Sequence, residues 1–343
     1  MKKNKSSRRK FCCLACTFVV IIAALVYYYF FGSMLLKPTT QYIYIDNDDT
    51  VDSVCNKLAE ISKPSSMTGF RTLVRHTSYS EDIHTGRYEI TKSNGPVAVF
   101  HKLKSGLQAP VSLTVPSVRT LDKLADAVSK KMMFSSKELL DSITDISVCR
   151  KYGYTPETIS CMFIPNTYDL YWNMPIGKFL DKMNSESKKF WSFERKNKAK
   201  AMGLSPVEVI TLASIVDEET ANDGEKPMIA GMYYNRLKAD MPLQADPTIK
   251  YALKQFDQKR IYHNMLSTNS PYNTYRNTGL PPGPIRIPTV KGIDAVLNYV
   301  HHDYLYMCAK EDFSGTHNFA RTYDEHQKNA AKYSKALNER GIN

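Results

Sequence analysis

Three consecutive carboxylates, Asp217, Glu218 and Glu219, are the side chains of this 343-residue chain best suited to acid–base chemistry. They end a predicted helix that begins with a capping box and a proline at its first position, Ser205–Glu208. At about 100° per residue, Glu219 falls inside the apolar arc centred on Leu212, whereas the other two acids fall outside it. The spacing therefore selects Glu219 as the carboxylate that continues the buried stripe.

A carboxyl group on an apolar helix face is poorly solvated, which raises its pKa. The two neighbouring acids and the negative end of the helix dipole act in the same direction. A Glu219 that stays protonated near neutral pH has the property required of a general acid for glycosidic bond cleavage. The alternative is that the three acids form a solvated patch or salt bridges at a helix end.

The residues around this helix resemble the central motif of the endolytic murein transglycosylases, also called the YceG-like family. Further blocks follow in the family's order and together span about residues 160–330. These blocks are Ala213–Thr220, Tyr234–Leu237, Met241–Tyr251, Ser270–Tyr275, Gly279–Ile285, Tyr304–Tyr306, Gly315–Phe319 and Glu325–His326. An ordered set of this kind is more specific than any single motif.

The resemblance implies that Glu219, which directly precedes the threonine of the motif, is the catalytic residue. It also implies cleavage of the β-1,4 bond between N-acetylmuramic acid and N-acetylglucosamine within peptidoglycan strands, leaving a 1,6-anhydro end. No metal or cofactor takes part in that reaction. The chain departs from the family at Asp217, where Glu is usual, and at Asn166, where Asp is more common.

Other polar residues of these blocks are expected to bind and orient the sugars: Gln244, Asp246, Asn273 and Tyr275. Their amide, carboxylate and phenol groups suit the recognition of hydroxyl and N-acetyl groups. Asp246 and Asn273 also fit turn positions, so a purely structural role stays open for them.

The histidines near the carboxyl end do not predict a metal site. His301, His302, Asp303, His317 and His326 lack the regular helical spacing of histidines in zinc hydrolases. His317 lies in a family block and is expected to support the active-site wall.

The amino-terminal segment predicts a single membrane helix. Residues 11–36 carry no charge and would reach roughly 39 Å as a helix, more than the ~30 Å hydrocarbon core. The run ends in an aromatic cluster, Tyr27–Phe31, which suits a membrane–water boundary. Basic residues within 1–10 predict a cytoplasmic tail, with the catalytic part on the outer side of the plasma membrane. A cleaved signal peptide, whose apolar region is shorter, is the alternative.

The formal net charge of +12 does not require a nucleic-acid partner. Six of the positive charges lie within residues 1–10, where they act on topology, and the remainder faces anionic envelope material. With 43% hydrophobic and 23% charged residues, the chain is neither collagen-like nor largely disordered. The four cysteines beyond the anchor are expected to be free, buried thiols, with disulfides as the alternative: Cys55, Cys149, Cys161 and Cys308.

The exported part predicts an α+β fold. Residues 41–160 show small alternating units, which we interpret as LysM-like or spacer modules. The strands expected there are 42–45, 86–90 and 111–115. The helices expected there are 50–61, 97–103 and 120–128, the last capped by Thr120. Residues 161–343 are expected to form a mixed, helix-rich catalytic domain.

Two other hypotheses remain. A muramidase would cut the same bond with water and would need a second carboxylate, for which Asp246 is the candidate. A non-catalytic wall-binding scaffold would not need an acid on an apolar face, so the presence of Glu219 argues against it. The resemblance also implies peptidoglycan synthases (penicillin-binding proteins) as expected partners, with termination of nascent strands as the outcome.

Overall fold

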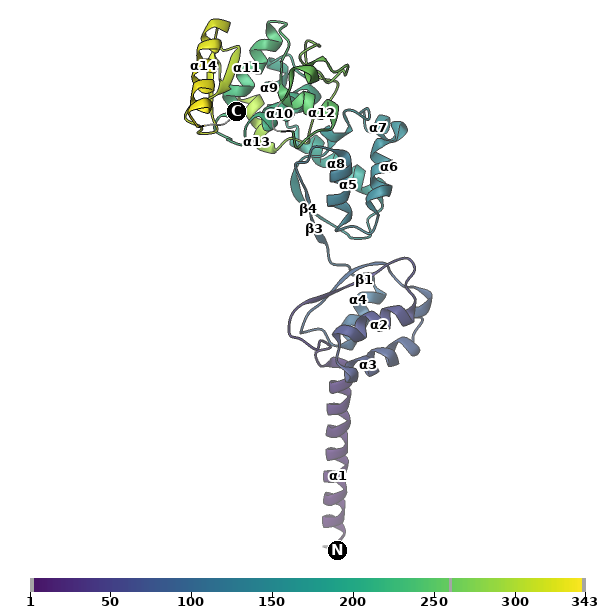
Figure 1. Ribbon diagram of the computed structural model, residues 1–343. Coiled ribbons are helices and arrows are strands. Elements are labelled where there is room, and N and C mark those ends of the chain that lie inside the picture. Colours follow the sequence, from purple (N-terminus) through teal and green to yellow (C-terminus); the bar gives the residue numbers. More distant parts are fainter. Residues whose placement is uncertain (1–2, 259–260, 341–343) are drawn as a thin grey trace. The chain divides into compact units, whose positions relative to one another are not determined.

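The computed structural model describes residues 3–258 and 261–340 (Figure 1). Within these residues, helices and three two-stranded sheets confirm the predicted α+β class. The chain divides into two compact units, of which the first contains the chain up to Leu113 together with Lys131–Met133 and Asp169–Met174. Residues 1 and 2, part of the predicted cytoplasmic tail, lie outside the described residues.

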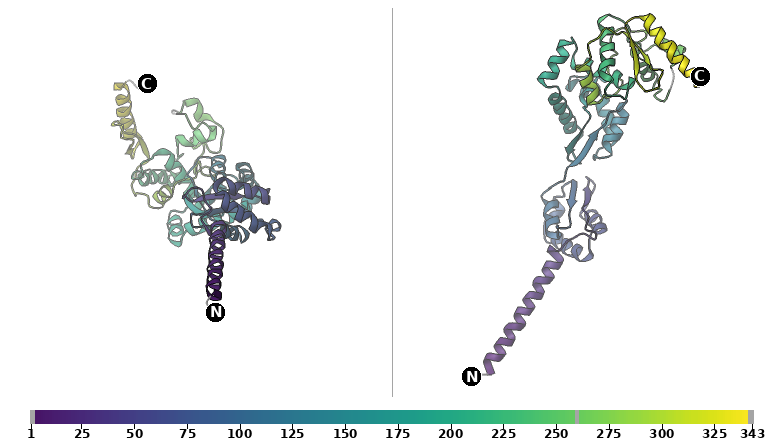
Figure 2. Two further views of the ribbon diagram at one scale, coloured as in Figure 1. Left: turned by 90° about the horizontal axis from the view of Figure 1, so that it is seen from below. Right: turned by 90° about the vertical axis from the view of Figure 1, so that its left-hand side faces the viewer.

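The amino-terminal segment is helical, as predicted. α1 spans Lys3–Val26 and continues into a π-helical turn, Tyr27–Phe31 (Figure 2). Within this segment, the 22 residues Lys10–Phe31 are long and apolar enough to cross a membrane. Most of their side chains are exposed. The helix is therefore compatible with a single membrane span.

The first βααβ segment folds around the inward-facing residues of two short strands. β1 (Gln41–Ile45) and β2 (Gly86–Ile90) pair antiparallel, with Ile43 opposite Tyr88. The helices of this segment are α2 (Val51–Ile61), α3 (Pro64–Arg75) and, after the second strand, α4 (Pro96–Lys104). Buried side chains of these elements, such as Leu58, form a core cluster of their own.

A second segment has a similar order, but three α-helices lie between its two strands. β3 (Val111–Val115) pairs with β4 (Asn166–Leu170) in a two-stranded sheet, and α8 (Ile176–Phe190) follows. The helices between the two strands are α5 (Leu121–Ser129), α6 (Ser136–Thr144) and α7 (Ile146–Lys151). The strands and helices predicted within 41–160 are thus confirmed. One detail is wrong: Thr120 precedes α5 with extended backbone, but its side chain accepts no capping hydrogen bond from the first turn.

Helix α10 (Pro206–Glu219) lies at the centre of the second unit. It contacts α9 (Phe193–Ala201), α11 (Lys226–Lys238), α12 (Asp246–Leu253) and α13 (Val290–Leu297). Residues Thr114–Lys130 and Phe134–Tyr168 belong to the same compact unit as this helix. The functional division into 41–160 and 161–343 stays a prediction.

A hairpin and a long helix complete the second unit. β5 (Tyr306–Ala309) and β6 (His317–Ala320) pair antiparallel, with Met307 opposite Phe319. α14 (Tyr323–Glu339), yellow in Figure 2, packs along this hairpin. The hairpin and the start of α14 supply one wall of the pocket described next.

Candidate active site

The predicted capping box fixes the start of α10. The Ser205 N–H donates to the Glu208 carboxylate at 2.7 Å, and the Glu208 N–H donates to the Ser205 hydroxyl at 3.3 Å. The helix ends at Glu219 because the backbone of Thr220 is extended, with φ −146° and ψ 139°. The three predicted acids therefore lie at the carboxyl end of a helix that is buried over most of its length.

Asp217 is a structural anchor. The helical-wheel argument places it outside the apolar arc, yet its side chain is buried. Its carboxylate pairs with the Lys226 ammonium at 2.8 Å and accepts the Thr289 N–H at 2.6 Å. Because protein surrounds α10 on several sides, a wheel cannot tell an acid that faces a partner from one that faces water.

Glu218 is held by two arginines from distant segments. Arg119 binds it through two N–H groups at 2.8 and 2.9 Å, and Arg286 donates a third at 3.0 Å. Arg286 also donates to the Ser117 hydroxyl at 2.8 Å. The loop ahead of α5 is therefore part of the support for the end of α10.

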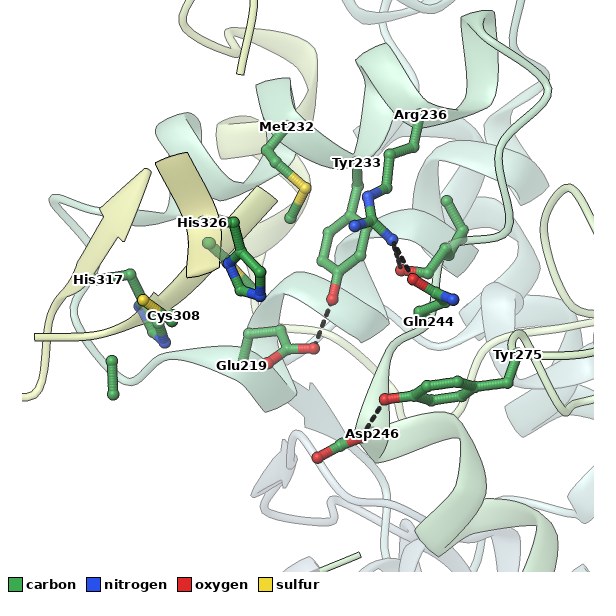
Figure 3. Close-up of a pocket in the computed structure, with 13 residues that line it drawn as sticks. Glu219, Met232, Tyr233, Arg236, Gln244, Asp246, Tyr275, Cys308, His317 and His326 are labelled. Carbon is green, nitrogen blue, oxygen red and sulfur yellow. Dashed lines mark hydrogen bonds between the residues drawn. The ribbon is translucent and has the colours of Figure 1, made fainter. Parts of the chain in front are cut away.

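Glu219 lines a pocket of about 360 Å³ (Figure 3). Tyr233 of α11 donates its hydroxyl to Glu219 Oε1 at 2.5 Å. Tyr233 is 2% exposed, so this donor is fixed in place by packing. The pocket is lined by Glu219, Met232, Tyr233, Arg236, Leu243, Gln244, Asp246, Tyr275, Met307, Cys308, Ala309, His317 and His326.

The surroundings of Glu219 raise its pKa to about 7. Burial is the main cause, because it removes water from the ionised carboxylate. The hydrogen bond from Tyr233 opposes this shift by stabilising the carboxylate, whereas the negative charge of Asp246 adds to it. Near neutral pH the group thus exchanges readily between its acid and base forms, as a single acid–base catalyst requires.

Three of the four predicted substrate-binding residues line the same pocket as Glu219: Gln244, Asp246 and Tyr275. Asp246 accepts a hydrogen bond from the Tyr275 hydroxyl at 2.5 Å, and Gln244 Oε1 accepts one from Arg236 Nη1 at 3.2 Å. Figure 3 shows these pairs on the side of the pocket that faces away from His317.

Asn273 is not part of the pocket lining. Its side chain is 0% exposed and is used inside the loop: Nδ2 donates to the carbonyls of Leu266 and Thr268, and Oδ1 accepts the Tyr275 N–H. Asn273 therefore holds the loop that presents Tyr275, which is the structural role left open by the sequence.

His317 lines the pocket wall, where its Nδ1 lies 3.0 Å from the Glu225 carboxylate. Asn166 begins β4 and is exposed. All four cysteines beyond the anchor are free, as expected, but Cys308 is only partly buried and lines the pocket. Cys308 lies in a two-stranded hairpin, one face of which borders the pocket. The sequence alone did not predict this exposure.

Sequence reasoning missed several residues of the pocket. Tyr233 lies in the interior of an apolar helix, where an aromatic residue normally indicates core packing. Arg236 lies within a family block, but only the fold brings it to Gln244. His326 also lies in such a block and reaches the pocket from α14. The position of Tyr233 directly before the block Tyr234–Leu237 could have indicated that this residue belongs to the site.

The fold and the site define a class of protein: an α+β enzyme with one near-neutral carboxyl in a polar pocket, suited to single-residue acid–base catalysis. Residues 43–332 match the sequence profile of the YceG-like family, and the chain belongs to this family.

Relatives support the same placement. The chain is 31% identical over 326 residues to the endolytic murein transglycosylase of Bacillus subtilis. The aligned region covers 88% of this chain and 87% of the relative. It is 29% identical over 294 residues to the endolytic murein transglycosylase of Streptococcus pneumoniae R6, covering 77% of this chain and 53% of that protein. A crystal structure of a YceG-like protein from Listeria monocytogenes matches with a TM-score of 0.53 and 26% identity, covering 85% of this chain and 99% of that chain.

Proposed function

We propose that this protein is an endolytic murein transglycosylase that cuts peptidoglycan glycan strands within the chain. The observation that carries the proposal is the Glu219 carboxyl, whose pKa is raised to about 7 inside a pocket lined by sugar-binding residue types. The names of the relatives support the reaction class. No metal or cofactor enters the scheme.

The reaction needs one carboxyl group. Protonated Glu219 donates its proton to the glycosidic oxygen as the bond to C1 of N-acetylmuramic acid breaks. The resulting carboxylate then accepts the proton of the sugar's own C6 hydroxyl, whose oxygen bonds to C1 and closes the 1,6-anhydro ring. Because the nucleophile belongs to the substrate, its effective concentration is high and no activated water is required.

Gln244, Asp246 and Tyr275 are the proposed substrate-binding residues, with Asn273 supporting them from within the loop. The hydrogen bond between Tyr275 and Asp246 orients both side chains on one wall. Tyr233 is a positioning residue, since it fixes the carboxyl of Glu219 through the hydroxyl.

Asp246 also favours a second candidate, a hydrolytic muramidase. Its carboxylate lies in the same pocket and acts electrostatically on Glu219, so a second acid is available to activate water. The two reactions differ in their products by one water molecule, which makes them separable by mass.

The other parts of the chain serve to place the active site. We propose that Lys10–Phe31 anchors the protein in the plasma membrane as a single span, with the basic tail in the cytoplasm. The segments β1–β2 and β3–β4 are proposed as LysM-like or spacer modules, a role supported by the order of strand, helices and strand that they share. Peptidoglycan synthases are the proposed partners, and nascent strands the proposed target.

The test is to incubate the full chain, in detergent, with uncrosslinked glycan strands and to weigh the products. We expect internal cuts with 1,6-anhydro ends. Products that are heavier by one water would instead identify a muramidase, and unchanged strands would leave only a binding role. Glu219→Gln is expected to lose about 100- to 10,000-fold in kcat/KM. Glu218→Gln, next to it in sequence, should keep activity to within about 10-fold because Glu218 does not line the pocket.

A further inference from the structure

The backbone of Gln244 has an unusual conformation, which fixes the direction of its side chain. Its φ is 52°, in the left-handed region that residues with a Cβ rarely adopt. The Gln244 N–H donates to the Thr274 carbonyl at 3.0 Å, and the next N–H, of Ala245, donates to the Thr274 hydroxyl at 3.0 Å. Backbone strain of this kind is tolerated where surrounding contacts hold it, so the side chain of Gln244 is presented from a fixed point.

Arg236 determines which end of the Gln244 amide faces it. Its guanidinium donates to the carbonyls of Pro242 (3.0 Å), Leu243 (2.9 Å) and Leu305 (2.6 Å), and to Gln244 Oε1 at 3.2 Å. A guanidinium only donates, so the amide atom that it contacts must be the carbonyl oxygen. The Nε2 group is consequently directed away from Arg236, as Figure 3 shows.

The Nε2 group is a donor in need of an acceptor. In the part of the chain that the structure describes, no hydrogen bond from Nε2 is present, and the Gln244 side chain is exposed in the pocket. The hydroxyl groups of Tyr233 and Tyr275, which also line the pocket, already donate to the carboxylates of Glu219 and Asp246. The neutral N–H groups of Gln244 thus remain for substrate.

Arg236 also strengthens this donor. Its side chain is buried, and its hydrogen bonds within the described residues go to neutral carbonyl oxygens. A cation bound to the oxygen of an amide polarises the amide and makes its N–H groups better donors. A strong acceptor opposite Nε2 would gain the most from this polarisation.

We propose that Gln244 is a specificity residue whose Nε2 donates to the acetamido carbonyl oxygen of a sugar in the strand. This inference rests on the proposed function. In a glycan strand the acetamido oxygen is a carbonyl acceptor, whereas a hydroxyl both donates and accepts and would satisfy the site less selectively. Removing the acetyl group leaves an ammonium, which brings donors and a positive charge toward Nε2 and Arg236.

The experiment pairs a change in the enzyme with a change in the substrate. Wild type and Gln244→Glu are compared on fully N-acetylated strands and on two preparations, each deacetylated on one of the two sugars. Gln244→Glu keeps the shape and the acceptor for Arg236 but removes both N–H groups. Gln244→Met, which has neither donor nor acceptor, is the second variant in case the charge of Glu alters folding.

We expect wild-type kcat/KM to fall by about 100-fold on one deacetylated preparation. Gln244→Glu should cut acetylated strands about 10- to 100-fold more slowly, with no further penalty for deacetylation. Equal deacetylation penalties in wild type and both variants would overturn the inference. The same comparison of binding affinity in a Glu219→Gln background does not depend on turnover, so it tests Gln244 even if the anhydro product, and with it the proposed function, fails to appear.

Discussion

The first βααβ segment and the second compact unit each contain a carboxyl group that burial affects, but the pKa values of the two groups shift in opposite directions. Burial disfavours ionisation of Asp49 in the first segment, but hydrogen bonds from Lys57 and Ser53 outweigh it, so the pKa of Asp49 is lowered. Burial also disfavours ionisation of Glu219, whose partner is the neutral hydroxyl of Tyr233, and its pKa is raised to about 7.

The hydrogen-bonding partner, and not burial alone, decides whether a buried carboxyl group is ionised at neutral pH. A cation beside Asp49 keeps it ionised and makes it a stabilising contact. A phenol beside Glu219 orients the carboxyl without supplying a positive charge, so the proton stays available for chemistry. At neutral pH the raised pKa of Glu219 therefore lowers the free energy of unfolding, whereas the lowered pKa of Asp49 raises it.

The largest expected effect on activity comes from replacing the carboxyl group of Glu219 by a neutral amide. Glu219→Gln should lower kcat/KM by about 100- to 10,000-fold. The raised pKa of Glu219 contributes stability that is present at low pH and lost as pH rises through about 7. Glu219→Gln should therefore stabilise the protein by roughly 1–3 kcal/mol at pH 8 and have little effect at pH 4, measured by thermal melting.

Asp49→Asn is the matched change in the first segment. The lowered pKa of Asp49 contributes stability above its unfolded pKa, which is lost as pH falls. We expect a loss of about 1–3 kcal/mol at neutral pH and unchanged cleavage of strands. Comparable losses of activity in both variants would remove the distinction between the two regions.

Arg119→Ala tests the contacts that support the end of α10. It removes the two N–H groups that bind Glu218, which frees the end of α10 from the loop ahead of α5. We expect kcat/KM to fall by about 10-fold because the position of Glu219 is less well fixed. Lys57→Ala, which removes the partner of Asp49, is the control and should leave the kinetics unchanged.

Tyr233→Phe is expected to shift the pH dependence. Loss of the hydroxyl removes a bond that stabilises the Glu219 carboxylate, so its pKa should rise by about 1 unit. Because the protonated form is active, the alkaline limb of kcat/KM should move to higher pH. Tyr234→Phe is the control, since that hydroxyl donates to the Met202 carbonyl. A limb that stays in place in both variants would contradict the role of Tyr233.

Asp246→Asn should give the smallest shift, in the opposite direction. Its negative charge helps to keep Glu219 protonated, so its removal should lower the pKa of Glu219 by about 0.5 unit. The alkaline limb should move to lower pH, while Asp294→Asn, a change in the ion pair with Arg195, leaves it in place. An upward shift for Asp246→Asn would show that this carboxylate does not act on Glu219 as described.

Much of the fold could be predicted because its signals are local. The capping box at Ser205 marks the start of α10, and the alternation of strand residues marks β1, β2 and β3. The family motifs also selected Gln244, Asp246 and Tyr275, which the structure brings to one pocket.

The remaining features depend on contacts between distant parts of the chain. Arg119 and Glu218 are 99 residues apart, and nothing local to either residue indicates their pairing. Tyr233 and Asn273 depart from expectation for the same reason. Tyr233, which has the pattern of a core residue, contacts Glu219, whereas Asn273, a polar residue of a motif, is wholly buried in its loop.

The most direct test of the role proposed for Glu219 is a titration of its carboxyl group. The chain is labelled with carbon-13 at glutamate carboxyl groups, and the Glu219 signal is assigned by its absence from Glu219→Gln. We expect a titration midpoint near pH 7, following the raised pKa of this group. A midpoint near 4.5, the ordinary value, would mean that Glu219 is ionised at neutral pH and would contradict its role as the general acid.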